Sequence, residues 1–225
     1  MSNRASMAQH DGRRSYCHRG GEQPLLGATI PEHFATAAAR HAGQEAVVSV
    51  PQQRRLSYRE LVHEVDRLAR GLLGIGCGKG DRIGIWSTNN LEWLLLQLAT
   101  ARIGAILVNI NPAYQARELA YALRRSEVQF LFTIPAFHSS DYVAMLLELL
   151  PALAREPAAE PVNESLPTLK RVIIYDPAAP SATRRPCPGF LTWPEVLAAG
   201  KSLAGDTLDI AGATLDPDDA INIQY

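Results

Sequence analysis

Apolar and polar positions alternate along the chain with two different periods, which divide it into expected helices and strands. The clearest helical period follows Ser57, where Leu61, Val65 and Leu68 recur on one face with charged residues between them. Ser57 and Glu60 have the spacing of a capping box, which predicts that a helix begins there. Apolar runs of five or six residues are too short for typical helices and predict buried strands.

The expected elements follow one another as strands alternating with helices. Helices are predicted over residues 29–41, 57–73, 89–102, 118–125, 141–150 and 192–200. Strands are predicted over residues 46–50, around Leu56, and over 82–86, 105–110, 128–133, 169–175 and 221–225, the first two forming a hairpin. This alternation favours βαβ units, so the predicted fold class is α/β with a mostly parallel sheet and flanking helices.

Composition divides the chain into four expected regions. Residues 1–28 form a basic leader without the apolar run of a secretory signal, predicted to be flexible, with a mitochondrial presequence as the alternative. Residues 29–150 form an α/β core, and residues 151–168 a Pro/Ala-rich, exposed connection. Residues 169–225 continue the same subdomain, with an acidic loop expected over residues 206–219.

Charge and cysteine usage exclude several classes of function. The net charge of −1 gives no electrostatic reason for binding nucleic acid or an anionic membrane. Cys17, Cys77 and Cys187 are far apart and odd in number, so neither a disulfide framework nor a zinc site is expected. These features favour the cytoplasm if the chain is bacterial, as its composition suggests, or the mitochondrial matrix if it is eukaryotic.

The most apolar region, residues 91–110, is interrupted by four polar side chains. They are Glu92, Gln97, Arg102 and Asn109. Because ionised groups at bilayer depth are costly, the region predicts a buried helix followed by a buried strand, and no transmembrane segment.

The glycine-rich run from Gly74 to Gly80 resembles a nucleotide-binding loop only superficially. Phosphate-binding loops place glycines after a strand and before a helix, so that free backbone N–H groups face the phosphates. Here the predicted order is helix, glycines, strand, which presents helix carbonyls instead. Lys79 is followed by Gly80 rather than Ser or Thr, so the run predicts a helix C-cap and a tight turn.

No other motif predicts a catalytic constellation. The histidines lack metal-ligand spacing and are expected at the surface or in caps: His10, His18, His33, His41, His63 and His138. Cys17 beside His18 lies in the leader, where no pocket is expected. Asp218 and Asp219 resemble a carboxylate pair for Mg²⁺, but a solvated turn is the favoured interpretation. Trp86 and Trp93 are assigned to core packing.

Several blocks, in order and at plausible spacing, resemble the N-terminal subdomain of the adenylate-forming acyl-CoA synthetases. The similarity is strongest to the group that contains the medium-chain fatty acid ligases. The blocks are Ser15-Tyr16, Pro24 to Gly27, Leu56 to Leu61, Gly80 to Trp93, Gln97 to Tyr114, Glu118-Leu119 and Ala220 to Tyr225. Asn109, Asn111, Pro112 and Tyr114 fall in this match and are interpreted as shaping a strand-to-helix turn.

The resemblance implies ATP, Mg²⁺ and CoA as cofactors of a complete enzyme, with a fatty acid as substrate. In that family the strand matched by residues 220–225 leads directly into the phosphate loop. A strand with that pattern needs a turn and a partner, which the sequence after it would supply. We therefore expect an incomplete subdomain, truncated at its last strand, that holds no catalytic, cofactor-binding or metal-binding residue and is inactive alone. A split ligase completed by a second polypeptide and a non-catalytic α/β interaction module are the alternatives.

Overall fold

Six strands form one central sheet in the order β10-β4-β3-β5-β8-β9, and every neighbouring pair is parallel. This computed structural model describes residues 26–155 and 165–225, so the predictions for Cys17, His10 and His18 lie outside the described residues. The strands of the sheet are β3 (Arg82–Trp86), β4 (Ile106–Ile110), β5 (Phe130–Thr133), β8 (Arg171–Ile174), β9 (Phe190–Thr192) and β10 (Asn222–Gln224). The predicted fold class is confirmed.

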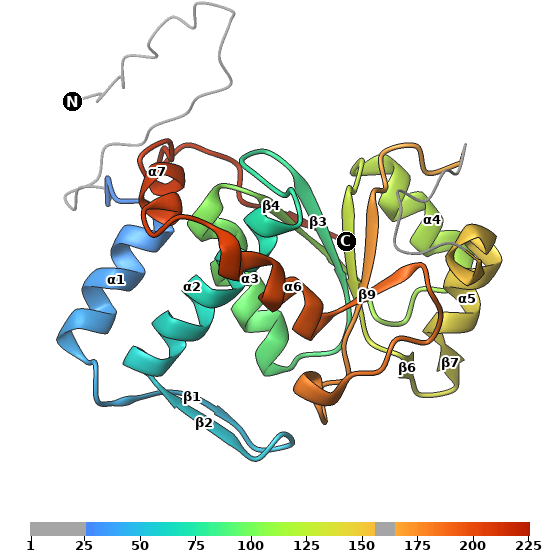
Figure 1. Cartoon of the computed structure of the whole chain (residues 1–225), viewed down its shortest axis with the longest axis horizontal. Helices are drawn as coiled ribbons and strands as arrows, with labels where there is room; N and C mark the ends of the chain where they lie inside the picture. Colours follow the sequence, from blue (N-terminus) through green and yellow to red (C-terminus); the bar gives the residue numbers. More distant parts are fainter. Residues whose placement is uncertain (1–25, 156–164) are drawn as a thin grey trace, which may run out of the picture.

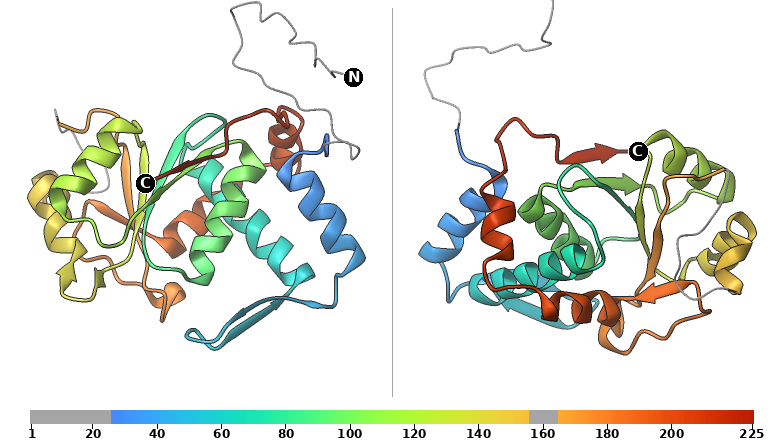
Figure 2. Two further views of the ribbon diagram at one scale, coloured as in Figure 1. Left: turned by 180° about the vertical axis from the view of Figure 1, so that it is seen from behind. Right: turned by 45° about the horizontal axis from the view of Figure 1, so that its top comes forward.

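Helices cover both faces of the sheet (Figures 1 and 2). One layer contains α1 (Ile30–Arg40), α2 (Tyr58–Gly74), α3 (Leu91–Ile103), α6 (Trp193–Ala199) and α7 (Thr207–Gly212). The opposite layer contains α4 (Ala116–Arg125) and α5 (Tyr142–Leu149). Two short antiparallel hairpins lie outside the central sheet, namely β1 (Glu45–Ser49) with β2 (Arg54–Ser57), and β6 (Ala136–Phe137) with β7 (Ser140–Asp141).

Local sequence signals explain where the helices begin. Thr29 with Glu32 and Ser57 with Glu60 form the predicted capping boxes of α1 and α2. Asn90 caps α3, and Gly104 ends it in the left-handed conformation at φ 73°. These elements match the ranges expected from the sequence to within a few residues.

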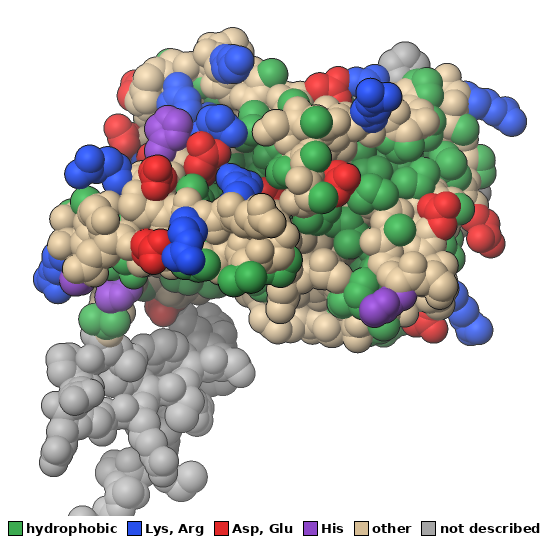
Figure 3. Space-filling model, turned by 90° about the horizontal axis from the view of Figure 1, so that it is seen from below, with side chains coloured by type: hydrophobic (Ala, Val, Ile, Leu, Met, Phe, Trp, Pro, Cys, Tyr) green, Lys and Arg blue, Asp and Glu red, His purple; other side chains and the backbone are tan. Residues whose placement is uncertain are grey.

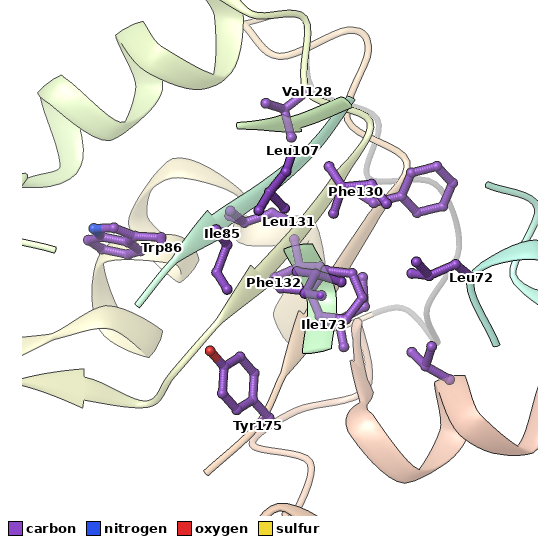
Figure 4. Close-up of a cluster of buried hydrophobic side chains, with 14 of the residues drawn as sticks. Leu72, Ile85, Trp86, Leu107, Val128, Phe130, Leu131, Phe132, Ile173 and Tyr175 are labelled. Carbon is purple, nitrogen blue, oxygen red and sulfur yellow. The ribbon is translucent and has the colours of Figure 1, made fainter. Parts of the chain in front are cut away.

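The core lies on both sides of β3, the central strand (Figure 4). Ile85 belongs to a row of side chains that includes Phe132 and Ile173 and faces the α2 and α6 layer. The next row contains Trp86, which stacks on Tyr142 of α5 with ring centroids 3.4 Å apart and planes 4° apart. Ile85 and Trp86 are both buried, so β3 is apolar on both faces, as expected for an interior parallel strand.

Helices α2 and α6 cross at very short distance because glycines occupy the contact. A Cβ atom added at Gly71 would lie 2.6 Å from the carbonyl oxygen of Val196. A Cβ atom added at Gly200 would lie 2.6 Å from the backbone nitrogen of Gly71. Each helix backbone therefore occupies the space that a side chain of the other would need.

The acidic stretch 206–219 was expected to be a loop, and that expectation is wrong, because it contains α7. The reason is a tertiary contact that the local sequence does not reveal. Arg102 of α3 donates from Nη1 to the carbonyl oxygen of Leu208 at 3.1 Å and lies 3.5 Å from the Asp209 carboxylate. Leu208 is buried beneath this contact, which stabilises a helix of only six residues.

Three further departures concern the segments between the predicted elements. Helix α4 begins at Ala116 instead of residue 118, because Gln115 and Glu118 form a capping box. Strand β9 occupies residues that were assigned to a loop and to the start of a helix. Leu153 and Leu166, in the connection expected to be exposed, are both buried.

Strand β10 pairs with β4, an element far earlier in the chain. The expectation that this strand needs a partner after it is therefore incomplete, since one of its edges is already paired. Ile221 and Ile223 are half-buried, while Tyr225 is 37% exposed and its hydroxyl accepts a hydrogen bond of 3.0 Å from Ser126. The burial alternates more weakly than the sequence pattern predicted because β10 is an edge strand.

Candidate functional site

The carboxyl ends of β3 and β5 are the place where a sheet of this topology binds ligands. The connection after β3 leads to β4 on one side, whereas the connection after β5 leads to β8 on the other. In open α/β sheets, ligands bind outside the carboxyl ends of strands whose connections diverge in this way. Figure 3 views the molecule from the side of the two hairpins, and hydrophobic side chains gather in the right half of that face.

A buried tyrosine lies just beyond the carboxyl end of β8 and organises the loop after β3. The Tyr175 hydroxyl donates to Ser87 Oγ at 2.8 Å, and Asn90 Nδ2 donates to the same oxygen at 2.9 Å. Asn90 Oδ1 accepts the backbone N–H of Trp93, so this chain of hydrogen bonds ends at the N-terminus of α3. Burial raises the pKa of Tyr175 far above its usual range, so the phenol stays protonated and acts as a donor.

The ionisation of Tyr175 provides the first test of this arrangement. Because its pKa is raised in the folded state, the unfolded chain releases that proton first, from about pH 10 upward. The contribution of Tyr175 to stability is therefore fully present below about pH 10, and the free energy of unfolding should fall progressively as the pH rises from there toward the folded-state pKa. In an ultraviolet titration, wild type should keep one more phenol protonated before unfolding than Tyr175→Phe does. Equal numbers of protonated phenols in the two folded proteins would contradict the raised pKa of Tyr175.

The tip of the β1–β2 hairpin is fixed to the N-terminus of α3 by three residues that we call the hairpin latch: Gln52, Arg54 and Glu92. Arg54 Nη1 lies 2.8 Å from Glu92 Oε1, and Gln52 Nε2 donates to Glu92 Oε2 at 2.7 Å. Gln52 also accepts the Leu91 N–H at 2.8 Å and donates to the Pro177 carbonyl at 2.9 Å. The latch thus connects the hairpin, α3 and the loop after β8.

The contacts among the three latch residues were not predicted from the sequence, although one of the three, Glu92, stood out there. Glu92 is one of the four polar residues that interrupt the apolar region 91–110, and its side chain is only 1% exposed. A buried carboxylate requires a cation or several donors, so its partners had to lie elsewhere in the chain. Their positions in a hairpin turn about forty residues earlier could not be read from spacing.

The other polar residues that interrupt the apolar region 91–110 differ in their hydrogen-bond and ion-pair partners. Gln97 accepts a 3.4 Å hydrogen bond from Asn222, and Arg102 lies between Asp66 and Asp209. Asn109 Oδ1 is buried without a hydrogen-bond partner among the described residues. Across those residues, no helix combines the length and apolar character needed to cross a bilayer.

The glycine-rich run has the orientation predicted for it. The backbone N–H groups of Ile75 and Cys77 bond to carbonyls in the last turn of α2, and β3 follows. Gly76 and Gly80 adopt φ values of 87° and 83°, which favour glycine. The turn therefore presents a helix C-terminus to its surroundings. Cys77 is buried, and its pKa is raised by that burial, so its thiol is not a candidate nucleophile.

Asp218 and Asp219 lie in a turn held by its own side chains. Asp219 Oδ2 accepts the Asp216 N–H at 2.8 Å, and Lys79 Nζ approaches the same oxygen at 2.7 Å. The contact with Lys79 and the bond from Asp216 lower the pKa of Asp219. A carboxylate already neutralised by lysine does not fit Mg²⁺. No group of three or more His, Cys, Asp or Glu side chains within residues 26–155 and 165–225 is arranged to hold a metal.

The remaining candidates lie where the sequence suggested. Asn111 closes the turn between β4 and α4, with its Oδ1 accepting the Ala113 N–H at 2.9 Å and its carbonyl accepting the Tyr114 N–H. Trp86 is fully buried, and Trp93 packs against the core while partly exposed. The described histidines are all exposed: His33, His41, His63 and His138.

Comparison with solved structures shows that this α/β fold occurs in other proteins. The structure resembles coronafacic acid ligase from Pectobacterium brasiliense with a TM-score of 0.65 at 19% identity, covering 88% of this chain and 33% of that one. It also resembles the N-terminal domain of FACL13 from Mycobacterium tuberculosis with a TM-score of 0.60 at 20% identity, covering 87% of this chain and 41% of that one. At these identities the likeness shows the fold alone.

The sequence comparisons show the family directly. Residues 34–225 match the model of the AMP-binding enzymes, and the chain belongs to this family. The mitochondrial medium-chain acyl-CoA ligase ACSF2 of Rattus norvegicus is 38% identical over 217 residues, covering 95% of this chain and 34% of the relative. The corresponding protein of Danio rerio is 34% identical over 211 residues, covering 94% of this chain and 34% of the relative. The chain thus spans about a third of the length of the curated relatives it matches.

Proposed function

We propose that this chain is the N-terminal part of a fatty-acid–CoA ligase. In the complete reaction, a fatty acid carboxylate attacks the α-phosphate of ATP, which releases pyrophosphate and forms an acyl-adenylate. The CoA thiol then attacks the acyl carbon, giving acyl-CoA and AMP. The observation that carries the proposal is the continuous family match over residues 34–225, together with 38% identity to a named acyl-CoA ligase.

We further propose that the chain is inactive alone and holds no catalytic, cofactor-binding or metal-binding position. A triphosphate needs backbone N–H groups, a lysine and Mg²⁺ around it. In the described part of the chain, the glycine turn presents carbonyls and Lys79 is paired with Asp219. Lys170 lies 6.0 Å from the Phe130 ring, at the amino ends of the strands, and Lys201 is exposed in the turn that follows α6. ATP, Mg²⁺ and CoA therefore belong to the completed enzyme.

An exchange assay tests this proposal. The purified chain, given a fatty acid, ATP and Mg²⁺, should produce no exchange of labelled pyrophosphate into ATP above a reaction without protein. A complete medium-chain acyl-CoA ligase assayed in parallel shows that the conditions support adenylation. Fatty-acid-dependent exchange by the 225-residue chain would refute the inactivity.

The alternatives differ in whether a second polypeptide is needed. A split ligase takes its remaining regions from another chain, whereas a non-catalytic α/β module needs none. Reading the gene beyond the codon for Tyr225 for an in-frame or frameshifted phosphate loop and lid tests the split ligase. Solubility and monomer state at a concentration on the order of tens of micromolar separate a stable module from a fragment that needs the rest of the enzyme. The named relatives are mitochondrial, which supports a mitochondrial location over the cytoplasm.

A further inference from the structure

A groove lies between the first turns of α1 and the segment that leads from α7 to β10, and α1 and α7 lie close together in Figures 1 and 2. It consists of two adjoining cavities of about 90 Å³ and about 410 Å³, whose linings share Thr29, Pro31 and Leu215. Gly104 and Ile221, which precede β4 and β10, also line it. This surface, which we call the α1–α7 groove, therefore lies at the amino ends of the strands, away from their carboxyl ends.

The α1–α7 groove combines apolar side chains, such as Ile30 and Val62, with an excess of carboxylates. The carboxylates that line it are Glu32, Asp66, Asp209, Asp216 and Asp219. Arg102 lies 3.3 Å from Asp66 and 3.5 Å from Asp209, so two carboxylates share one guanidinium. Lys79 lies 2.7 Å from Asp219. Among the described residues, these two cations face five carboxylates, so the groove is negative and favours a basic segment as its occupant.

The described part of the chain begins at one end of the α1–α7 groove. Ala28 lines the smaller cavity, so the residues that precede Leu26 are joined to the chain next to it. Leu26 is 75% exposed, and a Cβ atom added at Gly27 would meet nothing within 4 Å, so open space surrounds this point. A segment tethered so close to a binding surface reaches an effective concentration on the order of millimolar. Weak contacts are therefore sufficient for it to occupy the groove.

Residues 1–25 of the basic leader have the charge that complements this groove. Their charged side chains are Arg4, Arg13, Arg14 and Arg19 against Asp11 and Glu22, so this segment is positive in a chain whose net charge is −1. The match to the rat relative covers 95% of this chain, more than residues 26–225 alone supply, so it extends into the leader. The leader is thus part of the sequence that the two proteins share, which favours a role for it in the folded protein.

We propose that residues 13–25 bind in the α1–α7 groove, where Arg13, Arg14 and Arg19 face its carboxylates and Tyr16 packs against its apolar side chains. Bound there, the segment fastens α1 to α7, a helix of only six residues, and reduces the repulsion among the carboxylates. The inference goes beyond the proposed function and does not depend on it, because the groove and the carboxyl ends of β3 and β5 are at opposite ends of the sheet.

Cys17 is a native reporter with which to test this proposal in the full 225-residue chain. Cys187→Ser leaves Cys17 and the buried Cys77 as the only native cysteines. Ala213→Cys then introduces a thiol at an exposed position in the groove. Ala136→Cys, at an exposed position in β6, is the matched control. Mild oxidation of dilute protein, followed by mass spectrometry, measures how fast Cys17 forms an intramolecular disulfide with each introduced thiol.

Ala213→Cys should form the disulfide roughly tenfold faster than Ala136→Cys, because binding raises the local concentration of Cys17 at the groove. Arg19→Glu should slow the reaction about threefold, whereas Arg4→Glu, outside the bound segment, should leave the rate unchanged. Added salt should also slow the reaction, because it screens contacts between exposed charges. Equal rates for the two introduced thiols, or equal effects of the two arginine substitutions, would overturn the inference.

Amide hydrogen exchange tests the same contact without an introduced cysteine. In the wild-type chain, the amides of residues 13–25 should exchange more slowly than in an isolated peptide of that sequence, and Arg19→Glu should reduce the difference. If Ala213→Cys unfolds at a lower temperature than wild type, this measurement decides alone. Exchange at the rate of the isolated peptide would overturn the inference. So would a disulfide that forms only between two chains, since the leader of a second copy would then occupy the groove.

Discussion

Glu92→Ala is expected to lower the free energy of unfolding by about 2–4 kcal/mol, because it removes the carboxylate at the centre of the hairpin latch. Arg54 Nη1 and Gln52 Nε2 both donate to that carboxylate, which is almost fully buried. The expected loss lies toward the low end for a broken buried pair because the Arg54 side chain is 35% exposed and can be hydrated. Urea unfolding followed by circular dichroism measures the change.

The same hairpin contains a matched control for this prediction. Glu45 and Arg55 also form an ion pair at 2.8 Å, but their side chains are 59% and 65% exposed. Glu45→Ala should therefore change the free energy of unfolding by no more than about 0.5 kcal/mol. Similar losses for Glu92→Ala and Glu45→Ala would show that burial of the latch does not determine its contribution.

Gly71→Ala is expected to destabilise the protein by about 1–3 kcal/mol, although alanine favours a helix interior by about 1 kcal/mol. The new Cβ atom would lie 2.6 Å from the Val196 carbonyl oxygen, which is backbone and cannot move without shifting α6. Thermal unfolding followed by calorimetry is the appropriate measurement. The comparison variant is Gly43→Ala, whose Cβ atom would meet nothing within 4 Å. Gly43→Ala should be neutral or stabilising, by up to about 1 kcal/mol, and a stabilising Gly71→Ala would show that the two helices separate easily.

The sequence was most informative where local chemistry determines structure. The capping pairs Thr29 with Glu32 and Ser57 with Glu60 placed two helix starts correctly, since their hydrogen bonds involve only nearby residues. Gly104 correctly predicted the end of α3, because a left-handed C-cap depends only on the φ angle of the capping residue. The apolar runs correctly predicted β3, β4 and β5, because a strand buried on both faces shows as a continuous apolar run in the local sequence.

The remaining features depend on contacts between distant segments, which no window of sequence contains. Helix α7 exists because Arg102, more than one hundred residues earlier, bonds to the Leu208 carbonyl. The hairpin latch depends on contact between the β1–β2 hairpin and α3. Glu92 was therefore recognised as a polar residue in an apolar region, but its ion pair with Arg54 was not predicted. The glycine-rich run was interpreted correctly because helix direction alone decides which backbone groups a loop presents.

The pairing of β10 with β4 has a consequence for synthesis of the chain on the ribosome. Leu107 and Asn222 are neighbours in the sheet although 115 residues separate them. At translation rates of about 5–20 residues per second, β10 is synthesised about 6–23 seconds after β4, and the outer edge of β4 has no partner strand during that time. During that interval β4 pairs with β3 on one side and is an apolar edge strand on the other. Slower translation of residues 111–221 prolongs the period in which a nascent chain can pair with the wrong strand.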